Sequence, residues 1–265
     1  MTLVSLLALC GALWLLALWL GRKPAAIETY SERGPTRPTG PTGPTPPWAT
    51  SPADLQARQT NSCDILMTLT DSGPGALSGT TIEIVAPSCE SGLPHTTDAH
   101  TIRMTESVWN SPRREEILTH ERVHLEQRRA PEVWRDFYAL SWGYRIVAEA
   151  PPALVADTAA TLRGNPDIYP ERWAVWRDRY WFATTYTNPK NPHIAQAKTR
   201  VWDANKGAWL PEPPEPWRAY FCTPAGECPQ QWEHPHEIAA VMWSDITRWT
   251  TPAAVALRNF MSREN

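Results

Sequence analysis

The sequence lacks a basic patch or stripe, and its charges nearly balance. It has 265 residues, with 25 Lys and Arg against 28 Asp and Glu, which gives a formal net charge of −3. Nucleic-acid-binding domains normally concentrate positive charge on one face, so no nucleic-acid partner is expected. The chain also lacks internal repeats beyond a brief recurrence of Gly-Pro-Thr near the N-terminus, which is too short for a collagen helix.

Proline and tryptophan are abundant, at 27 and 15 residues, and 42% of all residues are apolar. This length and apolar content allow one domain of about 200 residues plus extra segments. The prolines are concentrated near the N-terminus but also occur through the C-terminal half. The composition therefore predicts a loop-rich domain with rigid turns, in which tryptophan supplies much of the buried area.

The N-terminal residues 3–20 form an almost unbroken apolar run that ends at two basic residues. That length is just sufficient for a helix to cross a bilayer, so residues 1–23 are predicted to be a single-pass transmembrane anchor. A cleaved signal peptide is the alternative, although the start lacks Lys and Arg. Residues 24–60, rich in Pro, Thr and Gly, are predicted to be a semi-extended stalk, and residues 61–265 the folded domain.

Four cysteines outside the apolar run fall into two pairs. Cys63 and Cys89 flank two strand-like segments joined by Asp-Ser-Gly-Pro-Gly, so a hairpin would bring them together. Cys222 and Cys228 flank a five-residue loop that a disulfide could close. Two bridges imply an oxidising compartment, whereas the basic residues after the apolar run argue for a cytoplasmic C-terminal part. The favoured prediction is an extracytoplasmic C-terminal domain, secreted if the N-terminal segment is cleaved; four free buried thiols are the alternative.

The folded part alternates strand-like and helix-like segments in an order typical of an α+β domain. A small antiparallel or mixed sheet is predicted to come first, followed by a helical subdomain. The residues from 165 to 235 are expected to be mostly irregular. The strands are predicted at 65–69, 81–85 and 100–105, and the helices at 112–129, 132–147, 152–162 and 235–249.

The helix predicted at 112–129 carries the motif HExxH, with His120, Glu121 and His124. Residues four apart lie on one face of a helix, so both imidazoles can bind one metal ion. Glu121 is placed to act as general base toward a metal-activated water. Zinc is the expected cofactor, because two imidazoles, a carboxylate and a water form its usual catalytic site. The alternative is a solvated helix face with two ordinary histidines.

A third metal ligand has to come from elsewhere in the chain. The metzincin layout needs Gly at 127 and His at 130, where this sequence has Gln127 and Ala130. A Glu from a later helix is the other common solution, and Glu149 and Glu237 are the candidates. Glu237 is preferred, because prolines follow Glu149, whereas Glu237 sits in the first turn of a predicted helix beside small residues.

The pattern resembles a family of HExxH metalloproteases of the gluzincin type, associated with large DNA viruses and algae. Its matching blocks, in order, are His100-Thr101-Ile102, the run from Leu118 to Arg128, Trp142-Gly143-Tyr144, Asn165-Pro166-Asp167 and Glu233-His234-Pro235-His236-Glu237. The resemblance implies a zincin-like fold, zinc bound by His120, His124 and Glu237, and Glu121 as base. Gluzincins often place an Asp four residues after the ligand Glu, where this chain has Val241, so Asp245 is the candidate to orient a ligand.

Other residues have weaker support. Tyr144, His234 and His236 are candidates to stabilise a developing oxyanion, although buried packing is the commoner role of these residue types. The stretch from Trp173 to Phe182 is expected to be core rather than a carbohydrate-binding surface.

Taken together, the residues predict a zinc-dependent hydrolase. It would be a membrane-tethered metallopeptidase acting on a peptide or protein substrate and anchored through its N-terminal helix. The alternative is a non-catalytic, membrane-anchored binding protein with a structural or vestigial zinc site, because zincin scaffolds also serve other functions.

Overall fold

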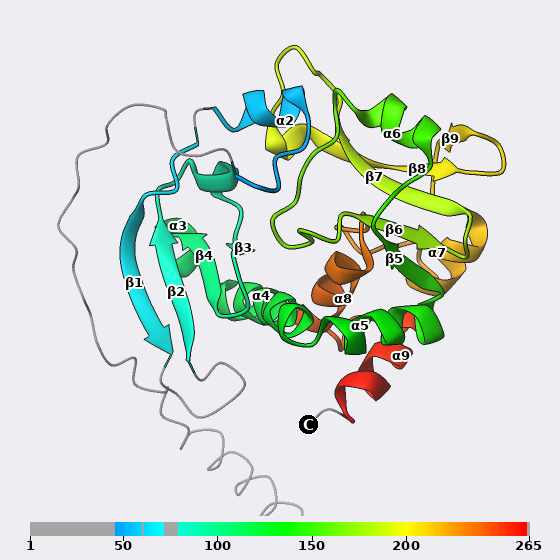
Figure 1. The fold of residues 1–265 in the computed structure, drawn as a ribbon. Helices are drawn as coiled ribbons and strands as arrows, with labels where there is room; N and C mark the ends of the chain where they lie inside the picture. Colours follow the sequence, from blue (N-terminus) through cyan, green and yellow to red (C-terminus); the bar gives the residue numbers. More distant parts are fainter. Residues whose placement is uncertain (1–45, 60, 72–78, 264–265) are drawn as a thin grey trace, which may run out of the picture.

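The structure, a computed structural model, describes residues 46–59, 61–71 and 79–263. These residues form an α+β fold with a four-stranded mixed sheet and a five-stranded antiparallel sheet. Figure 1 shows the two sheets on opposite sides of a pair of helices, α4 and α8. The α+β class predicted from the sequence is confirmed, and the second sheet is an addition to it.

The four-stranded sheet has the order β1-β2-β4-β3. Its strands are β1 (Ile65–Asp71), β2 (Thr80–Val85), β3 (His95–Thr96) and β4 (Thr101–Thr105). β2 pairs antiparallel with β1 and parallel with β4. Alternate side chains face the core, as the sequence pattern predicted, while Glu83 and Arg103 pair across the exposed face at 2.7 Å.

The five-stranded sheet corrects the prediction that residues 165–235 are mostly irregular. Its strands are β5 (Tyr144–Val147), β6 (Trp173–Trp176), β7 (Tyr180–Tyr186), β8 (Ala197–Asp203) and β9 (Ala208–Leu210), in that order across the sheet. The aromatic and β-branched content of β7 suits a strand. The turn from β6 to β7 was missed because Arg177 and Asp178, rather than Gly or Asn, adopt its positive φ values.

The two helices on either side of β5 are shorter than predicted. The structure has α5 from Pro131 to Phe137, followed by a π-helical turn over Tyr138–Trp142. Gly143, with φ of 73°, then ends the helix, so residues 144–147 form β5 instead of continuing it. α6 covers Pro152–Thr158 and stops before the predicted end at 162.

The remaining helices differ from the sequence prediction mainly at their ends. α4 covers Arg114–Arg129, two residues shorter at its start than predicted, after the short helix α3 (Glu106–Trp109). α8 (Pro235–Ser244) ends five residues before the predicted end at 249. The sequence analysis did not predict α2 (Pro52–Ala57), α7 (Glu215–Phe221) or α9 (Pro252–Met261).

Helix α4 joins the two halves of the fold because opposite faces of it enter different cores. Leu118 and Leu125 pack with the buried face of the four-stranded sheet. Val123 packs instead with α8, α9 and the aromatic residues of the second half. The stretch from Trp173 to Phe182 contributes buried Trp173, Trp176 and Phe182, as its interpretation as core predicted. Burial on both sides holds α4 firmly in position.

The end of the predicted stalk belongs to the folded body. Asp54 in α2 is fully buried, accepts a hydrogen bond from the Gly164 backbone at 3.0 Å and one from the Tyr186 hydroxyl at 2.6 Å. A Cβ atom at position 164 would collide with the Trp48 carbonyl, so glycine permits this close approach. Residues 46–59 therefore pack against the domain, and the predicted boundary at residue 60 lies too late.

Both predicted cysteine pairs lie at disulfide-bonding distance. The Cα atoms are 4.5 Å apart in Cys63–Cys89 and 4.2 Å apart in Cys222–Cys228. The predicted anchor, residues 1–23, lies outside the described residues. Within the described part of the chain, no helix is long and apolar enough to cross a membrane.

Candidate metal centre

Helix α4 presents two imidazoles from one face. His120 and His124 are one helical turn apart, and their Nε2 atoms approach to 3.1 Å. His124 is completely buried, whereas the side chain of His120 is 16% exposed. The pair therefore has one wall inside the protein and one side open toward solvent, as a site with an accessible coordination position requires.

Helix α8 brings Glu237 to this pair. Pro235 occupies the first turn, and the His234 side chain caps the helix by accepting a hydrogen bond from the His236 backbone at 3.3 Å. Ala239 and Ala240 are fully buried, and such small side chains allow α8 to lie close to α4. Glu237 thus occupies the first helical turn, as the sequence predicted.

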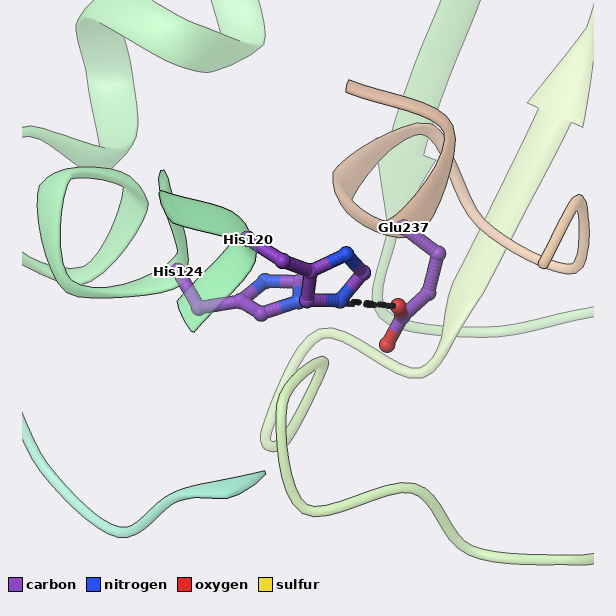
Figure 2. A group of neighbouring side chains, drawn as sticks. All are labelled: His120, His124 and Glu237. Carbon is purple, nitrogen blue, oxygen red and sulfur yellow. Dashed lines mark hydrogen bonds and ion pairs between the residues drawn. The ribbon is translucent and has the colours of Figure 1, made fainter. Parts of the chain in front are cut away.

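The three side chains converge on one point (Figure 2). Glu237 Oε2 lies 3.5 Å from the Nε2 atoms of both His120 and His124. The candidate ligand atoms of the group all fall within 4.8 Å of one another. Zinc ligands sit about 2.0–2.2 Å from the ion, so tetrahedral ligand atoms are roughly 3.3–3.6 Å apart. The observed separations therefore suit one small divalent cation.

Two buried carboxylate oxygens at this point lack hydrogen-bond donors. Glu237 Oε2 and Glu121 Oε2 have no hydrogen-bond partner among the described residues. Glu237 is 1% exposed and Glu121 3% exposed. An unpaired buried acceptor is costly, and a cation would compensate Glu237 directly. The donor set of two imidazoles and one carboxylate fits a metal such as zinc.

Gln127 orients His124. Its Oε1 accepts a hydrogen bond from His124 Nδ1 at 2.8 Å, so Nε2 is the ring atom that faces His120 and Glu237. Its Nε2 donates to the Tyr138 hydroxyl at 2.9 Å and to the His236 carbonyl at 3.1 Å. Sequence reasoning used Gln127 only to exclude a metzincin, although its position three residues after His124 places both on one helix face.

Asn165 performs the corresponding role for Glu237. Its Nδ2 donates to Glu237 Oε1 at 2.6 Å and, at 3.3 Å, to Glu233 Oε1. Its Oδ1 accepts a hydrogen bond from the Asp167 backbone at 3.0 Å, which fixes the amide orientation. Asn165-Pro166-Asp167 was one of the matching blocks in the sequence, but no role was assigned to it. Asp245, the candidate for orienting a ligand, instead accepts from Thr247 at 3.1 Å.

Burial disfavours charge on His124 and Glu237, but their mutual attraction outweighs it. The Glu237 and Asp167 carboxylates raise the pKa of His124 to about 10. The two imidazoles hold the pKa of Glu237 well below its usual range. His124 and Glu237 thus favour each other's charged forms, and a bound cation could replace this attraction for the carboxylate.

Glu121 lies in a different electrostatic environment. Burial, followed by repulsion from Asp167 and Glu237, raises the pKa of Glu121 well above its ordinary value. Burial also raises the pKa of Glu233 to about 7, with Glu237 adding repulsion. Of Glu121, Glu233 and Glu237, only Glu237 has a lowered pKa and is held in its charged form. A carboxyl with a raised pKa beside a cleft is a typical general base or acid.

His120, the more exposed histidine of the pair, borders a cleft of about 300 Å³. His120, Glu121 and Glu237 all line it. Its other walls come from five stretches of chain, within residues 90–95, 113–117, 163–167, 227–231 and 241–249. The cleft is wide enough for several atoms of a substrate and is open to solvent, so the group can meet an extended ligand.

Several predicted candidates lie elsewhere. Glu149, the rejected ligand, is exposed and does not belong to the metal-binding group. Tyr144 is buried in the core and accepts a hydrogen bond from Trp217 at 2.7 Å. His236 is held between Tyr138 and Glu171 at 3.1 Å from each. None of Tyr144, His234 and His236 is among the described residues that line the cleft. Their positions therefore argue against the suggested role in stabilising an oxyanion.

No protein-family model, curated protein or solved structure matches this chain. The resemblance to HExxH metalloproteases therefore stays a prediction from the sequence. Any inference about function therefore depends on the residues of α4 and α8 that meet beside the cleft.

Proposed function

We propose that this protein is a zinc-dependent hydrolase with a zincin-like fold, acting as a metallopeptidase on peptide or protein substrates. The observation that carries the proposal is the meeting of His120, His124 and Glu237, from two helices, beside the carboxyl group of Glu121. A structural site needs the ligands, but it does not need an adjacent buried carboxyl group facing a cleft. The combination favours hydrolysis over a purely structural metal.

His120, His124 and Glu237 would hold the metal, and zinc is the first choice because two imidazoles and one carboxylate are a common catalytic zinc set. When bound, zinc supplies Lewis acidity, polarising a carbonyl and lowering the pKa of a water. Gln127 and Asn165 keep the ligand atoms directed at one point through their hydrogen bonds. The chain thereby preorganises the site before substrate enters.

Glu121 would take the proton from the attacking water and later deliver it to the leaving amine. Glu121 lines the cleft, and its Oε2 has no hydrogen-bond partner among the described residues, so its carboxyl group keeps acceptor capacity for a water bound beside it. The low exposure of Glu121, 3%, strengthens its interaction with a charged neighbour. Positioned general bases of this kind contribute roughly 10²- to 10⁴-fold in rate.

We further propose that this domain lies outside the cytoplasm and is tethered to a membrane by the N-terminal segment of the chain. The two cysteine pairs at disulfide-bonding distance support an oxidising compartment. The apolar run of residues 3–20 supports the anchor. Protease protection of the intact protein in membrane vesicles would test the orientation.

A metal assay on the purified protein, followed by two matched variants, tests the proposed chemistry. Wild-type protein is expected to carry one zinc ion per chain and to cleave peptides. Glu121→Gln should keep the metal and lose about 10²- to 10⁴-fold in kcat. Glu126→Gln, a partly exposed position on the same helix, is the control and should keep both. Bound zinc without any hydrolysis would instead support a non-catalytic binding protein.

The third ligand has its own test. Glu237→Ala should abolish stoichiometric zinc binding, because it removes one of three ligand atoms. Glu149→Ala, at an exposed position after β5, should leave zinc binding unchanged. Metal loss in the Glu149 variant alone would contradict the assignment.

A further inference from the structure

Arg163 stands out among the charged residues of the cleft, because its hydrogen-bonding capacity is poorly used. Its side chain is 14% exposed, and its Nε has no hydrogen-bond partner among the described residues. Its one ion pair in the described part, to Glu233 Oε1, spans 3.6 Å, which is longer than a hydrogen bond. A guanidinium carries five N–H donors. The largely buried guanidinium of Arg163 has few partners for them, so it can donate hydrogen bonds to a further acceptor.

The neighbouring acid does not satisfy Arg163. The Glu233 oxygen that faces Arg163 also accepts the Asn165 side-chain amide at 3.3 Å. One shared oxygen at 3.6 Å cannot form the two parallel bonds that an arginine makes with a carboxylate. The opposite holds for Arg113 at another wall of the cleft, which donates to both oxygens of Glu116, at 2.9 and 2.7 Å. Arg163 therefore keeps guanidinium donors that the described residues do not use, whereas Arg113 already uses its own on Glu116.

The position of Arg163 connects it to the metal centre. Its backbone N–H donates to the Thr184 carbonyl at 2.8 Å, which pins the chain beside β7. Two residues later, Asn165 holds the ligand Glu237 at 2.6 Å. The same short segment thus orients a metal ligand and presents a cation to the cleft. Such fixed placement suits recognition of one particular group of a substrate.

We propose that Arg163 binds a carboxylate of the peptide substrate, and so selects substrates with an anionic group next to the bond that is cleaved. This inference rests on the proposed peptidase function. The carboxylate has two sources, the free C-terminus of a peptide or an Asp or Glu side chain, and both present the planar pair of oxygens that guanidinium recognises.

Four matched peptide libraries distinguish the sources. The first pair contains acetylated hexapeptides of mixed sequence, ending either in a free acid or in an amide. The second pair is amidated and carries either Glu or Gln at one fixed position. Wild-type zinc-loaded protein is expected to favour one charged library over its neutral counterpart by about 10- to 100-fold in kcat/KM. Equal cleavage within both pairs would overturn the inference while leaving the peptidase proposal intact.

Variants of Arg163 separate recognition from a structural role. Arg163→Gln should remove the preference mainly through KM, because the lost contact forms already in the bound substrate. Arg163→Lys should retain part of the preference, since it keeps the charge without the fork. Arg113→Gln is the matched control and should leave the preference unchanged. If Arg163 merely neutralises Glu233, the double variant Arg163→Gln with Glu233→Gln should regain the preference, and that result would refute the proposal.

A binding measurement keeps the outcome independent of turnover. Zinc-loaded Glu121→Gln protein should bind peptides of the preferred charged library more tightly than peptides of the neutral library. Adding Arg163→Gln should abolish that difference in binding. Wild-type protein that cleaves nothing, combined with selective retention, would refute the peptidase function but support carboxylate binding by Arg163. Unselective retention would count against Arg163 in either case.

Discussion

The hydrogen bond between Gln127 and His124 leads to a sharp prediction about metal affinity. Gln127→Met conserves volume and apolar contact but removes the acceptor that lies 2.8 Å from His124 Nδ1. The imidazole then loses the partner that fixes its tautomer and orientation. Loss of such a partner typically weakens metal binding by about 10- to 100-fold, or roughly 1.4–2.7 kcal/mol. Zinc affinity of the variant, measured by competition with a chromophoric chelator, should fall within that range.

Stability without metal should change as well. Gln127 is 3% exposed and also donates to the His236 carbonyl, so Gln127→Met leaves buried groups on both helices without partners. An unpaired buried group costs about 1–3 kcal/mol, and chemical denaturation of the metal-free variant should show a loss of that size.

Two controls separate the metal effect from general damage. Gln127→Glu keeps an acceptor for His124 but loses the donor to His236, so it should destabilise the apo protein and yet retain most of the zinc affinity. Glu126→Gln, next to it on the partly exposed face, should alter neither quantity. Wild-type zinc affinity in Gln127→Met would refute the reasoning, because it would show that the His124 ring is held without this hydrogen bond.

Three further predictions concern stability. Replacing both cysteines of Cys63–Cys89 by serine should cost about 3–4 kcal/mol in unfolding free energy, given a sequence separation of 26; an unchanged denaturation midpoint would contradict it. Tyr144→Phe leaves the buried Trp217 Nε1–H without its acceptor at 2.7 Å and should cost about 1–3 kcal/mol, measured the same way. Hydrogen bonds from Arg179 hold the pKa of Asp203 below its ordinary value. The stabilisation is therefore present above the unfolded-state pKa and lost as pH falls through the lower folded-state value. Asp203→Asn should lower Tm at pH 7, with the difference shrinking below about pH 4; a difference that stays constant with pH would refute this.

The first half of the fold follows closely from local sequence. The strands around Ile82 and Ile102 alternate fully and partly buried residues, and α4 directs Leu118 and Leu125 toward one core and Val123 toward the other. His120 and His124 had to share one face as soon as α4 formed. Glu237 could also be named, because Pro235 and two alanines mark a helix start that can pack closely. Local periodicity and the residues typical of helix starts are the reasons that these features could be predicted.

The second sheet and the hydrogen bonds around the site depended on tertiary structure. The turn at Arg177 and Asp178 has no glycine or asparagine, and its positive φ values are tolerated only because the paired strands impose them. Asn165 reaches Glu237 across 72 positions of the chain. No local pattern encodes such a contact, because it forms only when the loop after α6 folds over α8.

The sequence by itself thus determined that His120 and His124 share one face of a helix, since helical spacing is a local property. Only the tertiary structure decided that Glu237 rather than Glu149 joins the two histidines. It also decided that Gln127 orients His124, that Asn165 orients Glu237, and that Arg163 lines the cleft beside them. The physical reason is that packing between α4, α8 and the two sheets sets the distances between residues far apart in the chain.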